Sequence, residues 1–313
     1  MAFKFLRPQV GLWHQGRRMY ASDRPKQSSM SYCVNLVKTR DYENYLASLL
    51  LPSVLHQPAF AIRAFNAEVA SVKDSVSDRT IGLMRMQFWK DTLEEICEGS
   101  KSPPAHPVAQ ELHRAFAKHH FSKDLLLNLI SSRERFLSNN PFQSLDEVDS
   151  YARDAFSSIN FVLLTCLNSD KSPSSQTGHA RHALNQLGMA QGVSTLLRAV
   201  PYHAQLRQVL LPTDLMMNQG VSVESVVRKG DSEGLRLVIE ATAARAQEHL
   251  DNSRFRMKYL SKDEKCLLLP AVATDAYLAA LHKAECNVFH DKLKVKNSWL
   301  PIQLYWHRFK GSY

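Results

Sequence analysis

Apolar side chains recur at helical spacing along most of the chain. The clearest case is residues 59–76, where Phe65, Val69, Val72 and Val76 follow one another at intervals of four, three and four positions. On a helix of about 3.6 residues per turn, such positions form a single apolar stripe. The side opposite this stripe is small and nearly neutral instead of richly charged. This pattern predicts a helix that is buried in the middle of a helical bundle.

The same spacing recurs in further segments, and no run of alternating apolar and polar residues predicts a strand. Glycine is scarce, at 11 residues, which favours long helices. The predicted helices cover residues 31–50, 59–76, 81–98, 106–119, 123–137, 149–167, 181–200, 223–228, 235–260, 265–285 and 298–309. No repeat and no break in composition follow residue 30, so residues 31–313 are predicted to form one continuous all-α domain.

Two helix boundaries are predicted from local chemistry. Ser144 is followed three residues later by Glu147, which is the pattern of a capping box at the start of a helix. Pro201 follows the helix predicted over residues 181–200. Proline removes a backbone hydrogen bond and clashes with the preceding turn. We therefore expect this helix to end or kink near Val200.

The first thirty residues differ in composition from the rest of the chain. They carry six basic residues against one acid, with apolar residues between the bases. This composition is typical of a mitochondrial transit peptide, and Arg18-Met-Tyr20 resembles a matrix-protease site. We expect residues 1–30 to be a disordered transit peptide, cleaved after Tyr20 or slightly later. The alternative is a basic tail that carries no targeting information.

Charge, hydropathy and cysteine content narrow the functional classes. The formal net charge is +9, but residues 1–30 account for +5 of it, and the remaining +4 comes without a nucleic-acid-binding signature. No apolar run approaches the roughly 20 residues needed to span a bilayer. The five cysteines are scattered without a CxxC pair, as expected for reduced thiols. We therefore expect a protein that is soluble or peripheral to a membrane and binds no nucleic acid.

Five blocks in a fixed order carry a family resemblance. The last runs from Leu187 through Gly-Met-Ala-Gln-Gly-Val-Ser-Thr-Leu-Leu to Arg198-Ala-Val-Pro-Tyr-His203, and is followed by Leu210-Leu-Pro212. The earlier blocks are residues 61–74, 85–91, 106–109 and the segment from 151 onward. Together they resemble the squalene/phytoene synthase family over about residues 40–290. The resemblance implies a single large helical bundle with the class I isoprenoid synthase fold.

The resemblance also identifies two sets of positions at which active members of that family carry acidic residues. Those residues hold magnesium on a prenyl diphosphate. In this sequence the matching positions are Ala70, Ser71 and Asp74 in the first set, and Ala199, Tyr202 and His203 in the second. Only Asp74 is a carboxylate, whereas magnesium prefers several oxygen ligands. We therefore predict a pseudoenzyme with no catalytic, cofactor-binding or metal-binding residues.

Other candidate residues leave two interpretations open. Arg85, Arg198 and Arg207 could contact a phosphate or lipid headgroup, or form salt bridges between helices. His179 and His182 have no third partner that would complete a metal site, so we interpret them as surface residues.

The segment from Trp299 to Lys310 is amphipathic, aromatic and basic. It could dock on an anionic membrane or on a protein partner. The alternative is that the segment packs on the core.

Several stretches resemble a divergent branch of the family that serves the assembly of mitochondrial respiratory complex I. They are residues 40–46, 65–77, 80–90 and 198–203. This resemblance implies a non-catalytic protein on the matrix side, peripheral to the inner membrane. It implies as partners early assembly intermediates of complex I, or NADH dehydrogenase subunit 1 during its biogenesis. The alternatives are a protein that binds a prenyl diphosphate or isoprenoid lipid, and a residual prenyltransferase.

Overall fold

The computed structural model of the protein describes residues 28–76, 78–99, 105–138, 140–169 and 176–312. Within these ranges all regular secondary structure is helical, which confirms the predicted all-α fold. The helices are α1 (Ser29–Arg40), α2 (Tyr42–Leu49), α3 (Ser53–Ser75), α4 (Arg79–Cys97), α5 (Pro107–His119), α6 (Lys123–Leu137), α7 (Leu145–Ala152), η1 (Arg153–Ser157), α8 (Ser158–Leu167), α9 (Gln176–Gln205), α10 (Thr213–Asn218), α11 (Val223–Lys229), α12 (Glu233–Arg256), η2 (Met257–Tyr259), α13 (Lys262–Cys266), α14 (Pro270–Lys283), η3 (Asp291–Lys294) and α15 (Leu300–Lys310).

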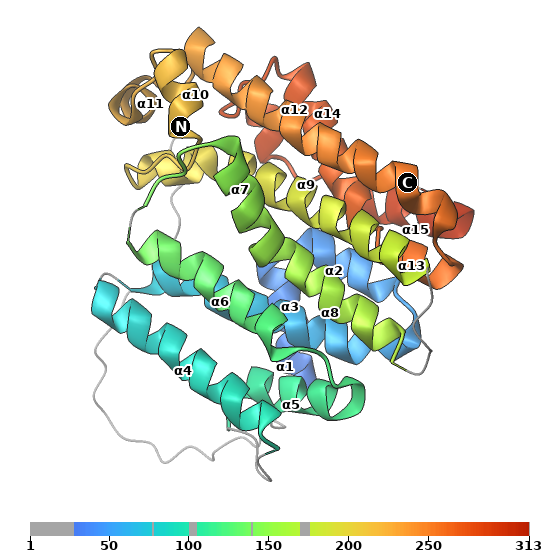
Figure 1. The fold of residues 1–313 in the computed structure, drawn as a ribbon. Coiled ribbons are helices and arrows are strands. Elements are labelled where there is room, and N and C mark those ends of the chain that lie inside the picture. The colour runs from blue at the N-terminus through green and yellow to red at the C-terminus, as the bar shows by residue number, and fades with distance from the viewer. Residues whose placement is uncertain (1–27, 77, 100–104, 139, 170–175, 313) are drawn as a thin grey trace, which may run out of the picture.

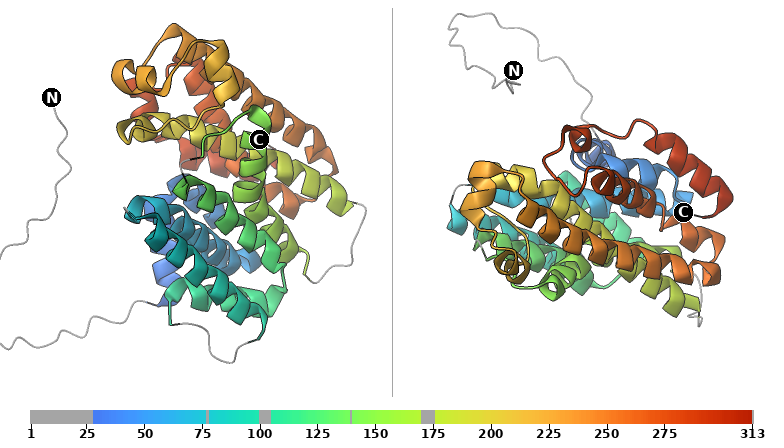
Figure 2. Two further views of the ribbon diagram at one scale, coloured as in Figure 1. Left: turned by 60° about the vertical axis from the view of Figure 1, so that its left-hand side comes forward. Right: turned by 90° about the horizontal axis from the view of Figure 1, so that it is seen from above.

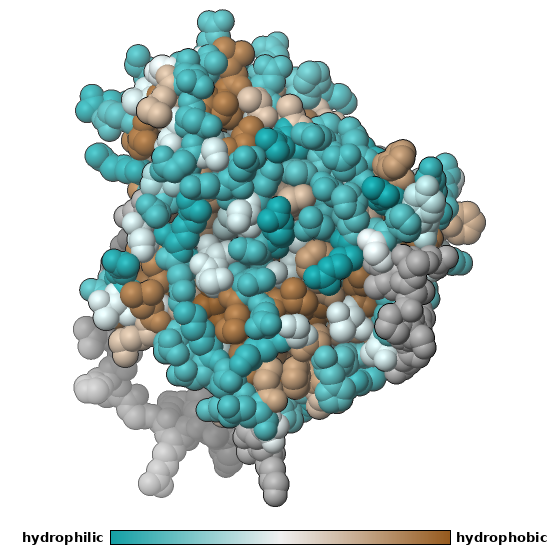
Figure 3. Space-filling view, in the orientation of Figure 1, coloured by the Kyte–Doolittle hydropathy of each residue, from teal (hydrophilic) through white to brown (hydrophobic). Residues whose placement is uncertain are grey.

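The helices are arranged around two long central members, α3 and α9. Helix α3 packs against α1, α5, α6 and α8, while α9 packs against α7, α8, α12 and α14. Figures 1 and 2 show α4 and α5 on one side of the bundle, α12 on the other, and α7 and α8 between them. The face seen in Figure 3 is mainly hydrophilic, and its hydrophobic side chains are broken up by hydrophilic ones.

Helix α3 is buried, as its apolar pattern predicted. Phe65 and Val69 are fully inaccessible to solvent, and Val72 is nearly so. Burying a large apolar side chain contributes about 1.5–3 kcal/mol, so this stripe anchors the N-terminal half of the bundle. The opposite side is also enclosed at Arg63 and Ala67. The last two turns of α3 instead line a cavity, which is described below.

The first described helix begins two residues before the first predicted helix, which was expected from residue 31. The predicted transit peptide falls outside the described residues except for its last three positions. There the Ser28 side chain accepts a hydrogen bond from the backbone N–H of Ser31 at 3.1 Å, so α1 begins at Ser29.

Two of the predicted helices are each divided in the structure. The helix predicted over residues 31–50 is interrupted at Asp41, whose φ and ψ of −143° and 65° are not helical. Its carboxylate accepts hydrogen bonds from Asn44 Nδ2 at 3.0 Å, and such local bonds compete with the helical backbone. The helix predicted over residues 265–285 becomes α13 and α14, and Pro270 begins the second of these.

The segment predicted as one helix over residues 149–167 contains a π-helical turn, η1. A helix begins at Leu145, directly after Ser144, so the predicted helix start at Ser144 is confirmed. The Ser144 side chain makes no capping hydrogen bond, so the bonds expected of a capping box do not form there. Glu147 is engaged elsewhere: its carboxylate accepts from Arg135 Nη2 at 2.6 Å and from the backbone N–H of Gln143 at 3.1 Å.

Helix α9 continues through Pro201 to Gln205, so it does not end near Val200, and of the two expected outcomes only a kink stays a prediction. Proline removes only its own backbone bond, and here that loss falls within about two turns of the helix end. The helix stops where Arg207 adopts a φ of 56°. The carbonyl of His203 accepts from the N–H groups of Leu206 and Gln208, both at 2.9 Å, which satisfies the final turn.

Two glycines bring α9 into backbone contact with η1 and with the end of α7. A Cβ added to Gly188 would lie 2.5 Å from backbone atoms of Ser157, and one added to Gly192 would lie 2.7 Å from Ala152 Cα. Distances this short exclude any side chain without moving the helices. Gly188 and Gly192 therefore fix the position of α9, and with it the placement of residues 198–205.

Candidate functional site

A cavity of about 500 Å³ lies where the last turns of α3 and α9 face each other, with α14 as a further wall. Both sets of positions singled out from the sequence line it. They are Ala70, Ser71 and Asp74 from α3, and Ala199, Tyr202 and His203 from α9. The fold thus brings residues more than 120 positions apart to one site. That these positions once held metal ligands stays a prediction.

The polar groups at this end of the cavity centre on Asp74. The Tyr202 hydroxyl is hydrogen-bonded to Asp74, and burial together with this carboxylate raises the pKa of Tyr202. Burial lowers the pKa of His203, an effect that the charge of Asp74 partly offsets. His203 Nδ1 is buried and has no hydrogen-bond partner among the described residues. This end of the cavity therefore combines the Asp74 carboxylate, the Tyr202 phenol and the His203 imidazole, whose pKa burial lowers.

Few metal-ligating groups gather in this region. Within the part of the chain that the structure describes, no group of three or more His, Cys, Asp or Glu side chains could hold a metal ion. His179 and His182 fall under the same observation, and the His179 ring stacks on Tyr259 with centroids 4.4 Å apart.

Of the three arginines singled out from the sequence, the structure places only Arg198 among the residues that line this cavity. Its Nη1 lies 2.8 Å from Glu43 Oε2, and its guanidinium lies 4.7 Å from the centre of the Tyr277 ring. Its charge is therefore already paired. Arg85 is exposed and donates to Ser75 Oγ at 2.6 Å, and Arg207 is exposed at the end of α9.

Arg133, which was not predicted from the sequence, also lines the cavity and is only 6% exposed. Its Nη2 donates to Asn66 Oδ1 at 2.7 Å, and both Nη atoms lie 3.5 Å from the carbonyl of Ala155 in the π-helical turn. Burial lowers the pKa of Arg133. The signal was present in the sequence, because Arg133 interrupts an apolar stripe at Leu126, Leu129, Ile130 and Leu137.

A second cavity, of about 570 Å³, adjoins the first. The two share the lining residues Arg40, Asp41, Glu43, Arg198 and Ala273. Residues 292–297, which lead into α15, line only the second cavity. Burial raises the pKa of Asp41 in the shared wall, although the nearby Arg63 opposes this shift. The site therefore extends from the ends of α3 and α9 to the segment before α15.

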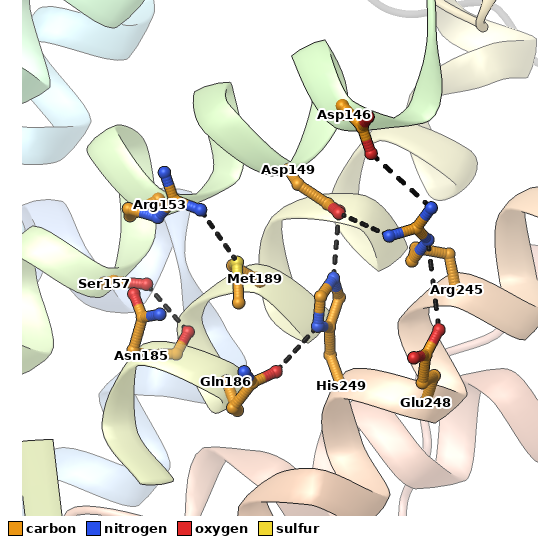
Figure 4. Close-up of polar contacts among 10 residues, drawn as sticks. All are labelled: Asp146, Asp149, Arg153, Ser157, Asn185, Gln186, Met189, Arg245, Glu248 and His249. Atoms are coloured by element: carbon orange, nitrogen blue, oxygen red, sulfur yellow. Dashed lines mark hydrogen bonds and ion pairs between the residues drawn. The ribbon is translucent and has the colours of Figure 1, made fainter. Parts of the chain in front are cut away.

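A buried polar cluster outside the cavities joins α7, α9 and α12 (Figure 4). His249 Nε2 lies 2.9 Å from Asp149 Oδ1, and its Nδ1 lies 2.7 Å from Gln186 Oε1. Arg245 Nη1 donates to Asp149 Oδ2 at 3.1 Å. These contacts connect positions up to 100 residues apart, which no local sequence pattern reveals. The cluster ties three helices together and shares no residue with the cavity linings.

The comparisons with known proteins agree with this architecture. The profile of the squalene/phytoene synthase family matches residues 37–299. The chain belongs to the squalene/phytoene synthase family. A dehydrosqualene synthase crystallised with a ligand has a TM-score of 0.76 at 19% identity, over 90% of this chain and 95% of that one. This likeness confirms the predicted isoprenoid synthase fold.

Within the family, the chain is similar over nearly its whole length to proteins named NADH dehydrogenase (ubiquinone) complex I, assembly factor 6. The protein from Bos taurus is 39% identical, over 98% of this chain and 93% of its own length. The protein from Homo sapiens is 37% identical over the same shares. A phytoene synthase from Rhodobacter capsulatus is 23% identical over 70% of this chain and 63% of its own. The predicted resemblance to the assembly-factor branch is confirmed.

Proposed function

We propose that this chain is a non-catalytic assembly factor for mitochondrial respiratory complex I. The observation that carries the proposal is its similarity to proteins named as complex I assembly factors over 98% of its length. A match of this extent includes the segments that form the cavity as well as those that form the helical framework. The role therefore belongs to the whole domain.

The absence of catalysis is proposed from the chemistry of the cavity. Ionising a prenyl diphosphate with magnesium needs several carboxylates, which hold the metal ions that neutralise the departing group. Among the six matching positions only Asp74 has a carboxylate, and its neighbours Tyr202 and His203 cannot replace the missing oxygen ligands. The remaining groups support contacts with a partner or ligand better than metal-assisted chemistry.

The finer role is an early step of assembly, in the biogenesis of NADH dehydrogenase subunit 1, on the matrix side of the inner membrane. The basic, acid-poor composition of residues 1–30 supports import into mitochondria. No helix among the described residues is long and apolar enough to cross a membrane. Peripheral attachment to the inner membrane would place the protein beside a subunit that is inserted there.

Gene deletion with complementation tests the assembly role. Cells that lack the gene should lose assembled complex I on native gels and accumulate less newly made NADH dehydrogenase subunit 1. The wild-type chain should restore both, and Asp74→Asn should restore them equally well because no metal chemistry is required. Normal complex I in the deletion strain would contradict the assembly role. Failure of Asp74→Asn alone, with normal protein levels, would contradict the absence of catalysis.

A second candidate function is binding of an isoprenoid lipid or prenyl diphosphate, and the cavity of about 500 Å³ favours it. Its walls combine aromatic side chains, such as Phe136 and Phe156, with polar groups at the end near Asp74. Native mass spectrometry of the purified protein should then show a copurified lipid, and added prenyl lipid should raise the melting temperature. A lipid-free protein with an unchanged melting temperature would count against this function.

A further inference from the structure

Helix α15 has an apolar face on each side, and only one of them is covered. Leu300 and Leu304 are buried, and Arg308 Nε donates to the carbonyl of Leu50 at 3.2 Å, so this face packs on the bundle. The core-packing interpretation of the segment thus holds for these two leucines. The helix lies at the edge of the bundle, against α2 and α14 (Figure 2).

The opposite face of α15 carries a continuous stripe of large apolar side chains. Ile302, Tyr305, Trp306 and Phe309 follow the i, i+3, i+4, i+7 spacing of one helix face. Their exposed fractions range from 54% at Trp306 to 78% at Phe309, and Trp299 just before the helix is 68% exposed. Scattered exposed apolar residues are ordinary, but a grouped aromatic stripe indicates an interaction surface.

The charge of the domain is concentrated beside this stripe. Residues 291–310 carry five basic residues and one acid, a net charge of +4. The whole chain carries +9, of which residues 1–30 hold +5, so residues 31–290 together have no net charge. The entire basic excess of the folded domain therefore lies in the segment that leads into α15 and in α15 itself.

Basic and aromatic groups are also in direct contact there. Lys310 Nζ lies 4.6 Å from the centre of the Trp306 ring, and the exposed Lys292, Lys294 and Lys296 precede the stripe. Aromatic side chains favour the headgroup region of a bilayer, and each basic residue near an anionic surface adds attraction. A protein partner would explain the apolar stripe, but it would not by itself explain why the basic excess is confined to this segment.

We propose that the outer face of α15, together with the basic residues 292–296, docks the protein on an anionic phospholipid surface. This inference rests on the proposed peripheral location at the inner membrane, and it names the surface that makes the attachment. Docking through this face would bring residues 292–297, which line the second cavity, to the membrane.

Vesicle flotation tests the docking surface directly. The chain is purified from mitochondria and mixed with phosphatidylcholine vesicles that contain about 20% cardiolipin, or with pure phosphatidylcholine vesicles. We expect binding to the anionic vesicles. Added salt should weaken this binding, because it screens the attraction between the basic residues and the anionic lipids. The variant Ile302→Ser/Trp306→Ser/Phe309→Ser should bind about tenfold more weakly or worse, since it loses most of the apolar contact. Lys292→Gln/Lys296→Gln should lose part of the preference for anionic vesicles, because three of the five basic residues remain.

The matched control is Met84→Ser/Phe88→Ser on α4. These side chains are also exposed, at 68% and 46%, but acidic residues follow them on the same helix. The control should float like the wild type, and circular dichroism should show that every variant keeps its helical content. The proposal is overturned if the wild type binds no vesicle, or if the α15 variant binds as the control does.

A third outcome would assign the face to a protein. If the α15 variant floats normally but loses association with an assembly intermediate or with a second copy of the chain, the membrane proposal is wrong. These results are independent of the assembly role. A chain that restores complex I but binds no vesicle contradicts only the docking surface, and a chain that binds vesicles but does not restore complex I contradicts only the assembly role.

Discussion

The middle and the C-terminal end of α9 meet opposite requirements. The middle, around Gly188 and Gly192, touches α7 and η1 at backbone distance, and Gln186 joins the buried cluster with Asp149 and His249. Its C-terminal end, from residue 198 to 205, faces the cavity, and Tyr202 is 47% exposed there. One part is fixed by close packing, whereas the other is only partly packed.

This difference would allow a synthase fold to keep its shape while side chains at its site are replaced. Packing at Gly188 leaves no space for a side chain, so substitution there disturbs the whole bundle. Side chains at the cavity are bounded by empty volume on one side, so Ala199 or His203 can stand there without displacing a neighbour. The closely packed helices and the cavity wall therefore tolerate amino-acid substitution to very different degrees.

The largest effect should come from Gly188→Val. The new side chain would collide with the backbone of Ser157, and we expect a loss of about 3 kcal/mol or more in the free energy of unfolding, measured by urea titration. Gly178→Val in the first turn of the same helix is the control, because a Cβ there meets nothing within 4 Å, and we expect a change within about 0.5 kcal/mol. Equal effects at the two sites would refute the contrast along α9.

The next largest effect should come from Asp149→Ala. Removing this carboxylate leaves His249 Nε2 without its partner in a buried site, and we expect a loss of about 2–3 kcal/mol in the free energy of unfolding. Asp146→Ala is the matched control, since Asp146 also faces Arg245, at 3.6 Å, but its side chain is 87% exposed. A surface pair of this kind contributes about 0–1 kcal/mol. A small effect at Asp149 would mean that the cluster does not hold the three helices together.

A gain in stability is expected from a substitution at the C-terminal end of α9. Pro201→Ala restores a backbone donor inside the helix, and the gain is partly offset because alanine leaves the unfolded chain more flexible. We expect the free energy of unfolding to rise by about 1 kcal/mol, measured by urea titration. A loss of stability would show that the proline ring makes packing contacts that outweigh the missing hydrogen bond.

The smallest effect concerns pH. Burial lowers the pKa of His203 in the folded protein, so below its ordinary value of about 6.5 the unfolded chain binds a proton more readily than the folded one. Stability should therefore fall as pH drops through this value, and the loss should be complete below the folded-state pKa. His203→Gln should flatten the decrease in melting temperature between about pH 7 and 5. Part of the decrease in melting temperature with falling pH should remain in this variant, because burial lowers the pKa of His106 as well. A slope identical to that of the wild type would contradict the assignment.

Local pattern was enough to predict the helices, because apolar spacing directly reflects burial on a helix. The helix predicted over residues 123–137 matches α6 at both ends. Pro201 shows the limit of this reasoning, since its local penalty was outweighed by the packing of the rest of α9. The π-helical turn was not predictable, because it is associated with the close approach of Gly188 to Ser157, which depends on tertiary structure.

The candidate site could be located from the sequence only through the family resemblance. The spacing within α3 or α9 does not show that Asp74 and His203 share a cavity. Arg133 was detectable as a charge inside an apolar stripe, whereas the contact between Asp149 and His249 joins residues 100 positions apart and leaves no local signal. Distances between helices that are remote in sequence come from the fold alone.

The central claim is that this synthase fold no longer ionises a prenyl diphosphate. The most direct test is a single-turnover incubation of excess purified protein with farnesyl or geranylgeranyl diphosphate and magnesium, followed by measurement of released diphosphate. The account predicts no release above that of a protein-free control. Release that depends on the protein and disappears in Asp74→Asn would contradict it.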